Sequence, residues 1–335
     1  MGRNHYNNGL RPFVPFFRNP HLLTIAGNFW PRAIDEARFP TRSVYYQTEP
    51  GTRVLIHEHR PPGESLGEVL LHHGLEGSSA SGYMISMAQC LLDAGFTVHR
   101  LNMRSCGGSE TLTDTLYHSG LTQDVRAVLE QLRMAGRGPR FLVGFSLGGN
   151  VTLKFAGELG EAANELVAGI CAVSTPIDLH ACVRRLGAPE NAIYARRFIR
   201  SLCARYRRRH TQHPERFPLD GIDHTHTIFD FDDRFTSQAF GFGSAANYYA
   251  TQSAMLFVAG IRVPALVVQA QDDPLIPFSI YESGEVRANP CIELVTPEHG
   301  GHLGFIAKNK PRFWLDPVIR DWIARIRNNC PPDHV

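Results

Sequence analysis

The most specific chemical pattern in this sequence is a serine between two glycines at residues 144–148, which read Gly-Phe-Ser-Leu-Gly. The apolar run 141–143 precedes the pattern, and a run compatible with a helix, 150–158, follows it. In that context G-x-S-x-G is typical of a nucleophile elbow, a sharp strand-to-helix turn that exposes the serine hydroxyl. The flanking glycines leave room for the close chain approach that the strained turn requires. We therefore predict that Ser146 is a nucleophile.

A serine hydroxyl becomes a good nucleophile when a histidine accepts its proton and a carboxylate orients that histidine. The last third of the chain offers both groups. The turn 271–277 follows an apolar run and carries Asp273, whose distance from Pro277 fits a D-x-x-x-P turn. The glycine-rich loop 298–305 carries His302, which glycines surround and an apolar segment follows. We predict Asp273 as the acid and His302 as the base.

Other residues compete for these two roles. Asp272 is the neighbouring carboxylate, although we expect it to cap or orient the turn. Asp178 follows the predicted strand 170–173, but it lacks a similar strand context after the turn at Pro176. His299 lies near the start of the same loop. Because the chain has sixteen histidines, a histidine can occur in such a loop by chance. The assignment therefore depends on the order Ser, Asp, His and on the chemistry of the loops.

Acyl transfer also requires two N–H donors for the developing oxyanion. One is normally the amide that follows the nucleophile, which here is Leu147. The other normally comes from a loop after an early strand, and the glycine-rich loop 72–79 follows the apolar run 69–71. We predict that the Leu75 amide, freed by the tight turn at Gly74, is the second donor. His73 is interpreted as structural.

The elements that must position these groups are short apolar runs, which alternate with helical segments along the chain. This rhythm predicts the α/β class, with a mainly parallel central sheet flanked by helices. It breaks between residues 175 and 264, where apolar residues recur at helical spacing over 195–206, so we predict a helical cap insertion. The predicted domains are an N-terminal extension (1–50) packed on the core, the core itself (51–175 and 264–330) and the cap or lid (176–263). The expected strands lie at 69–71, 96–98, 141–143, 170–173 and 265–268, and the expected helices at 83–94, 121–134, 150–158 and 314–326.

Several of these stretches resemble one family. The sequence is similar to the YheT-like branch of the α/β-hydrolase superfamily, which is related to the α/β-hydrolase domain proteins one and three and to yeast medium-chain ester synthases. The resemblance implies the α/β-hydrolase fold and the triad Ser146, Asp273 and His302. Residues 103–105 depart from it, because relatives commonly read Arg-Gly there. The matching stretches are 19–24, 73–79, 102–109, 144–150, 272–274 and 300–305.

The family implies carboxylic ester hydrolysis, with lipid-like esters in some members and alcohol acyl transfer in others. Our leading hypothesis is an esterase or lipase that forms an acyl-enzyme on short- to medium-chain esters, acylglycerols among them. The first alternative is an alcohol O-acyltransferase that makes medium-chain esters. The second is a binding protein that keeps the fold without turnover. A complete triad in the expected order argues against the second alternative.

The predicted cap carries three further patterns. Its aromatic residues around 229–235 and 241–249 favour core packing, and an apolar acyl pocket is the competing interpretation. Its arginines between 196 and 209 favour a solvated surface, with transient contact with a membrane surface as the alternative. One group could be drawn as a metal cluster but lacks a zinc-site framework, so we predict neither metal nor cofactor. That group comprises His224, His226, Asp230, Asp232 and Asp233.

Composition limits the partners and the compartment. The formal net charge of +2 is too balanced to predict a nucleic-acid partner. Seven widely scattered cysteines suit reduced thiols better than a disulfide framework, which favours the cytoplasm. We find neither a secretory apolar region at the start nor an apolar run long enough to span a membrane. The predicted partner is a small-molecule ester with an apolar acyl chain.

Overall fold

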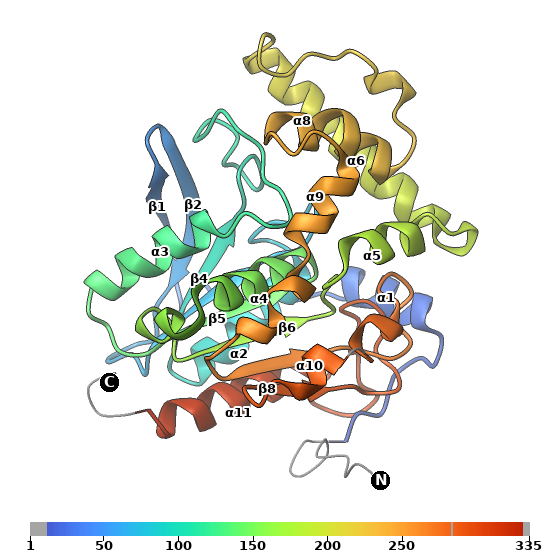
Figure 1. The fold of residues 1–335 in the computed structure, drawn as a ribbon. Helices are drawn as coiled ribbons and strands as arrows, with labels where there is room; N and C mark the ends of the chain where they lie inside the picture. Colours follow the sequence, from blue (N-terminus) through green and yellow to red (C-terminus); the bar gives the residue numbers. More distant parts are fainter. Residues whose placement is uncertain (1–11, 283, 331–335) are drawn as a thin grey trace.

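An eight-stranded sheet forms the centre of the molecule (Figure 1). The computed structural model describes residues 12–282 and 284–330, so residues 1–11 of the predicted N-terminal extension lie outside it. The strand order is β1-β2-β4-β3-β5-β6-β7-β8; β2 is antiparallel to β1 and β4, and every other pair is parallel. The strands are β1 (Arg42–Glu49), β2 (Thr52–His59), β3 (Glu68–His72), β4 (Thr97–Asn102), β5 (Arg140–Phe145), β6 (Gly169–Val173), β7 (Ala265–Val268) and β8 (Ile292–Val295).

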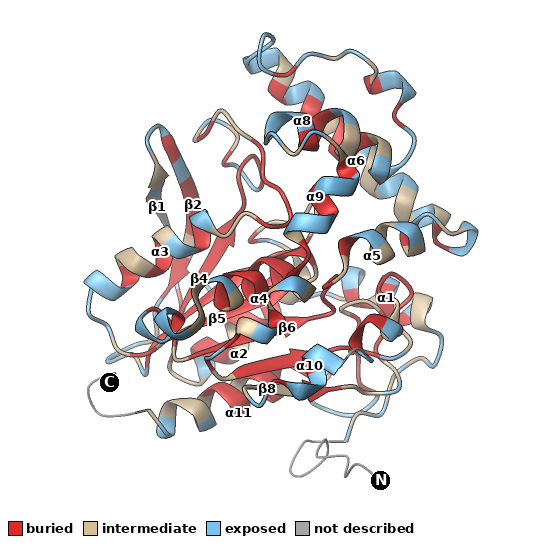
Figure 2. Ribbon diagram, in the orientation of Figure 1, coloured by how far each residue is buried: buried red, intermediate tan, exposed pale blue. Residues whose placement is uncertain are grey.

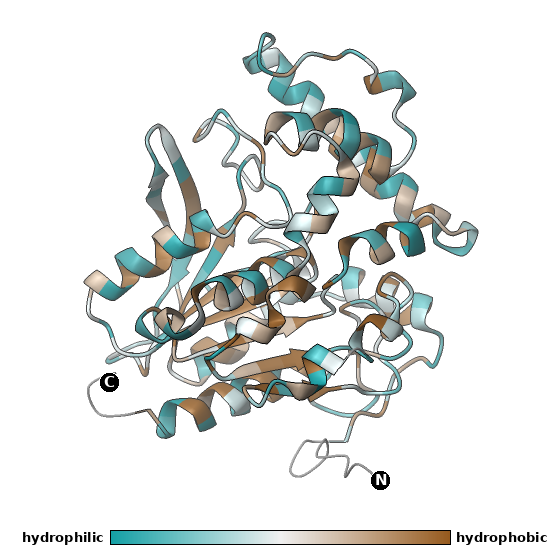
Figure 3. Cartoon of the chain, in the orientation of Figure 1, coloured by the Kyte–Doolittle hydropathy of each residue, from teal (hydrophilic) through white to brown (hydrophobic). Residues whose placement is uncertain are grey.

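Helices cover both faces of this sheet. On one face, α2 (Gly82–Asp93) and α11 (Leu315–Asn328) share an apolar cluster with Val69 and Leu71 of β3; on the other face, α3 (Gln123–Met134) and α4 (Leu147–Leu159) share a second cluster with Leu70. The central strands are buried on both sides, and β3 and β5 have continuous apolar runs at 69–71 and 141–143 (Figures 2 and 3). The predicted α/β class and mainly parallel sheet are confirmed.

The sequence predicted the strands β3 to β7 and missed β1, β2 and β8. Each predicted strand overlaps an observed one, from β3 to β7. Strands β1 and β8 lie at the two edges of the sheet, and both include partly exposed positions, which weakens the apolar signal. Strand β1 lies within residues 1–50, so this segment contributes an edge strand as well as helix α1 (Pro20–Phe29). The predicted domain boundaries stay a prediction.

A helical segment stands between β6 and β7, where the predicted rhythm breaks (Figure 1). Leu202 and Tyr206 of α6 belong to the same apolar core cluster as Val151 of α4, so the segment is packed on the sheet layer. Within the described part of the chain, none of the helices is both long and apolar enough to cross a membrane. The helices of this segment are α5 (Leu179–Leu186), α6 (Ala192–Gln212), α7 (Ile228–Phe231), α8 (Ser237–Ala239) and α9 (Ala245–Gln252); the short α10 (Gly284–Ala288) precedes β8.

Two glycines allow α4 to begin directly against the sheet. A Cβ atom on Gly148 would lie 2.4 Å from the carbonyl oxygen of His72 and 2.5 Å from that of His73. A Cβ atom on Gly144 would lie 2.3 Å from the carbonyl oxygen of Gly148. Real Cβ atoms do not approach backbone oxygens so closely, and these atoms belong to a strand end and a helix start. Position 148 in the first turn of α4, and position 144 opposite it, therefore have no room for a side chain.

We predict that Gly148→Ala lowers the free energy of unfolding by at least about 2 kcal/mol, because the new methyl group overpacks a rigid backbone contact. Urea denaturation followed by circular dichroism measures the change. The control is Gly284→Ala, since a Cβ atom there meets nothing within 4 Å. Equal stability of the two variants would contradict the packing argument.

Candidate active site

Ser146 occupies a strained turn between β5 and α4. Its backbone has φ 53° and ψ −120°, in a region that residues other than glycine rarely adopt. Two hydrogen bonds hold the turn: the Ser146 amide donates to the Val173 carbonyl over 2.8 Å, and the Gly149 amide donates to the Ser146 carbonyl over 2.8 Å. The neighbouring strand β6 thus fixes the turn that carries the hydroxyl.

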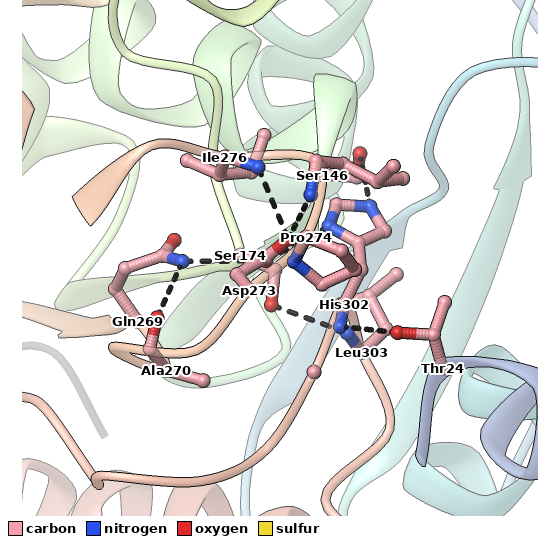
Figure 4. A network of polar contacts seen from close by, with 12 residues as sticks. Thr24, Ser146, Ser174, Gln269, Ala270, Asp273, Pro274, Ile276, His302 and Leu303 are labelled. Carbon is pink, nitrogen blue, oxygen red and sulfur yellow. Dashed lines mark hydrogen bonds and ion pairs between the residues drawn. The ribbon is translucent and has the colours of Figure 1, made fainter. Parts of the chain in front are cut away.

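The structure brings Ser146, His302 and Asp273 together in one line (Figure 4). His302 Nε2 lies 3.0 Å from Ser146 Oγ, and His302 Nδ1 lies 3.0 Å from Asp273 Oδ2. An ionised carboxylate only accepts hydrogen bonds, so the Nδ1 atom carries the ring proton and Nε2 remains an acceptor. The serine hydroxyl can therefore donate its proton to the histidine.

Asp273 is held by donors on every side. Its Oδ1 atom accepts hydrogen bonds from the amides of Leu275 and Ile276, at 2.9 and 3.1 Å. Its Oδ2 atom accepts from the Gln269 side chain over 3.2 Å as well as from His302. The carboxyl group is buried, and these donors replace the water that it loses on folding. Its direction toward His302 is thus fixed by the turn after β7.

The competing residues have other partners. Asp272 accepts from His299 Nδ1 over 3.0 Å and from the Gly301 amide over 2.9 Å, so it ties the turn to the histidine loop. Asp178 begins α5, where its side chain accepts from the Ala181 amide over 2.9 Å. Within the described residues, none of these three side chains is hydrogen-bonded to Ser146 Oγ, whose partner is His302.

Helix α1 supports the histidine loop, which the sequence reasoning did not foresee. The His302 amide donates to Thr24 Oγ1 over 2.9 Å, and that hydroxyl donates to the Pro20 carbonyl over 2.7 Å. The next amide, Leu303, donates to Ser174 Oγ over 3.3 Å (Figure 4). The stretch 19–24 belongs to the resemblance, but nothing in its residue types indicated a contact with a loop 278 positions away.

The two predicted oxyanion donors lie beside Ser146. Leu147 is the first residue of α4, and Leu75 lies in the loop after β3; neither amide donates a hydrogen bond to another described residue. His73 shapes that loop, because its Nδ1 atom bonds the Gly74 carbonyl over 2.8 Å and its Nε2 atom accepts from the Met103 amide over 3.1 Å. Burial lowers the pKa of His73 to about 4, so the ring is neutral and holds this pattern.

A buried ion pair joins the same loop to α6. Glu76, whose φ is 55°, follows Leu75 directly. Its Oε1 atom lies 2.6 Å from Arg205 Nη2 and accepts from the Tyr117 hydroxyl, while its Oε2 atom accepts from Ser201 Oγ over 2.5 Å. The Arg205 guanidinium also stacks on the Tyr117 ring, 4.5 Å from its centre. The loop that carries Leu75 is thereby fastened to the inserted segment.

Two cavities reach Ser146 and His302 from different sides. The first has a volume of about 860 Å³, which includes space open to solvent, and it extends under the inserted helices. Its walls are mainly apolar, with Asp232 and Tyr249 among its polar residues. The second encloses about 1040 Å³ on the same basis and lies between α1 and α6. The apolar residues of the first cavity include Leu116, Leu179, Leu186, Leu202, Ile228 and Phe231.

Two of the carboxylates that could be drawn as a metal cluster in the inserted segment have separate structural partners. Asp230 closes a capping box with Thr227 at the start of α7. Asp232 accepts from the hydroxyls of Tyr249 and Thr236, at 2.7 and 2.8 Å, and its burial raises its pKa to about 6. Across the described ranges, no group of three His, Cys, Asp or Glu side chains is arranged to hold a metal ion.

The departure at residues 103–105 has a local explanation. Ser105 has φ 61°, in the left-handed region that favours glycine, and its hydroxyl donates to the Thr115 carbonyl over 3.2 Å. The preceding Arg104 is buried and pairs with Asp124 over 2.6 Å. A serine therefore occupies a turn geometry for which glycine is the usual residue, and no hydrogen bond among the described residues joins this turn to Ser146.

Comparison with known proteins gives three likenesses. Over 322 residues the chain is 32% identical to YheT of Escherichia coli K12, a protein named as a candidate esterase, and the match covers 93% of each chain. It is 27% identical over 262 residues to the monoacylglycerol lipase of Saccharomyces cerevisiae, covering 75% of this chain and 58% of the yeast protein. The fold matches the Pyrococcus furiosus esterase Pf2001 with a TM-score of 0.55 and 17% identity, over 94% of this chain and 98% of that one.

A model of the alpha/beta hydrolase family matches residues 69–312, which include all three residues of the Ser146, Asp273 and His302 line. The strand order, the parallel pairing and the helices on both faces agree with this match. Because the family model spans most of the chain and the Escherichia coli relative aligns over nearly its whole length, this protein belongs to the alpha/beta hydrolase family, in the branch that contains YheT.

Proposed function

We propose that this protein is a carboxylic ester hydrolase in which Ser146 forms an acyl-enzyme. The observation that carries the proposal is the hydrogen-bonded line from Ser146 Oγ through His302 to Asp273, at the meeting point of two cavities. The esterase and lipase names of the relatives support the same reaction class. A nucleophile, a base and an orienting acid are the groups that acyl transfer requires.

The reaction follows from these positions. Ser146 Oγ attacks the ester carbonyl carbon while its proton passes to His302 Nε2, and Asp273 stabilises the imidazolium. The carbonyl oxygen becomes an oxyanion that accepts from the amides of Leu75 and Leu147. Collapse breaks the bond to the alcohol, which leaves with the proton from His302. Water then attacks the acyl-enzyme with His302 as base, and the acid is released.

The two cavities divide the substrate between them. The first cavity has the apolar walls that an acyl chain requires, and the acyl chain of a short- to medium-chain ester is its proposed occupant. The second contains polar groups such as Ser81, Tyr83 and Ser201, which suit the alcohol part of the ester. The lipase name of the yeast relative supports acylglycerols among the substrates.

A series of p-nitrophenyl esters of increasing chain length tests the proposal. We expect each added methylene to lower the activation free energy that corresponds to kcat/KM by about 0.8 kcal/mol until the first cavity is full. Beyond that length kcat/KM should level off. Ser146→Ala should lower kcat by about 10⁶-fold, because no acyl-enzyme forms. A fluorophosphonate should label the native chain and leave Ser146→Ala unlabelled.

The same assay separates the alternatives. Hydrolysis that persists in Ser146→Ala refutes the mechanism. Ethyl esters as the main product when ethanol is added would show an alcohol acyltransferase instead of a hydrolase. If the protein neither hydrolyses any ester nor reacts with the fluorophosphonate, the result would favour a binding protein of the same fold.

The adjacent carboxylates give a matched pair of variants. We expect Asp273→Asn to lower kcat by about 10⁴-fold, because the amide no longer fixes the ring proton on His302 Nδ1. Asp272→Asn should have a much smaller effect, since its remaining oxygen can still accept from the Gly301 amide. Steady-state kinetics on one short ester measures both variants. The reverse ranking would identify Asp272 as the acid.

The pH profile tests the base. His302 must be neutral to accept the serine proton, so kcat/KM for an uncharged ester should be low in acid and rise through a single ionisation. His302→Ala should remove this step together with most of the activity, whereas His299→Ala should keep the profile. A profile unchanged in the residual activity of His302→Ala would assign the ionisation to another group.

A further inference from the structure

An exposed apolar stripe runs along helix α1. Leu22, Ile25 and Phe29 recur at positions i, i+3 and i+7, which places them on one face of the helix. These side chains are 48%, 43% and 72% exposed, while Leu23 on the opposite side is fully buried. An isolated exposed leucine is ordinary, but three large apolar side chains in line on a ten-residue helix form a surface that water hydrates poorly.

A basic stripe runs along the first half of α6. Ile193, Arg196, Arg197 and Arg200 recur at i, i+3, i+4 and i+7, and all four are exposed, Ile193 by 75%. No ion pair or hydrogen bond links these arginine side chains to another residue in the described chain, whereas Glu190, just before the helix, is paired with Arg185 over 2.5 Å. The positive charges of this stripe are therefore available to an external partner.

The two stripes lie next to each other at the mouth of the second cavity. His21 of α1 and Tyr194 of α6 are in contact, with His21 Nδ1 3.2 Å from the tyrosine hydroxyl, and both helices are on the same side of the molecule (Figure 1). Ile25 and Phe29 from one stripe and Arg197 from the other line the cavity that leads to Ser146. Apolar and cationic groups thus surround one entrance to the candidate active site.

We propose that this face, formed by the outer sides of α1 and the first half of α6, docks on the surface of an anionic phospholipid membrane. Apolar side chains beside unpaired arginines provide the two attractions that stable interfacial binding needs, and neither attraction suffices alone. A second copy of the chain fits this face poorly, because a twofold contact would oppose the same arginines. When the protein is docked through this face, its second cavity opens toward the lipid. That consequence rests on the proposed function, whereas the docking does not.

Vesicle sedimentation tests the docking directly. The whole chain carrying Ser146→Ala, which prevents turnover, is mixed with vesicles of phosphatidylcholine alone or with 30 mol% phosphatidylglycerol, a composition of about one anionic lipid in three. We expect binding to the anionic vesicles that weakens as salt is raised, because mobile ions screen exposed charges. Equal binding to both vesicle types, or none to either, would overturn the proposal.

Substitutions on the two stripes locate the surface. The double variant Arg196→Gln with Arg200→Gln should weaken binding by about 30-fold, because each arginine near an anionic surface contributes roughly a factor of five to the affinity. Leu22→Ser with Ile193→Ser should also weaken it. The charge control is Arg126→Gln with Arg133→Gln, exposed positions on α3 that remove the same net charge. The apolar control is Met134→Ser, 77% exposed on the same helix.

The controls make every result decisive. Binding that the α1 and α6 variants lose and the α3 variants keep supports the proposal, and equal losses in both sets overturn it. A dimer in light scattering that Leu22→Ser with Ile193→Ser dissociates would assign the face to a second copy instead. Sedimentation does not require turnover. A protein that binds these vesicles without hydrolysing any ester would therefore contradict the proposed esterase activity and support the proposed docking.

Discussion

The site depends on the contact between two backbone loops that leave no room for side chains between them. The turn after β5 meets the loop after β3, where a Cβ atom on Gly148 would collide with the carbonyls of His72 and His73. From the other side, a Cβ atom on Gly74 would lie 2.9 Å from that of Ser146. These contacts hold the loop that carries Leu75 against the turn that carries Ser146 and Leu147. The strained φ of Ser146 persists because the sheet on one side and α4 on the other determine its position.

The buried ion pair of Glu76 and Arg205 extends this constraint to the inserted helices. Removing two charges from water is costly, and the cost is offset only where the geometry is good and further hydrogen bonds are made. Here Tyr117 and Ser201 supply those bonds. Since Glu76 is the residue after Leu75, the position of α6 is coupled to the loop that offers the predicted oxyanion donor. The inserted segment therefore acts on the site as a support as well as a cover.

Helices α1 and α6 serve both the interior and the surface. The inner side of α1 holds the histidine loop through Thr24, and the inner side of α6 holds the loop after β3 through Arg205. Their outer sides form the face that we propose for the membrane. A lipid ester moving from that face would pass through the second cavity to Ser146, with the apolar cavity beyond. Docking and catalysis would then share the same two helices.

The sequence by itself determined the features that depend on neighbouring residues. The glycines around Ser146 and the alternation of apolar runs with helical segments follow from local backbone requirements, so the turn, the strands β3 to β7 and the fold class could be predicted. The sequence favoured Asp273 over Asp272 through its spacing to Pro277 and the family resemblance, and the tertiary structure shows that the two adjacent carboxylates point to different histidines, Asp273 to His302 and Asp272 to His299. It also decided the contacts of Thr24 with His302 and of Glu76 with Arg205. Those contacts join segments more than 100 residues apart, and only the packing of the whole chain determines which distant side chains meet.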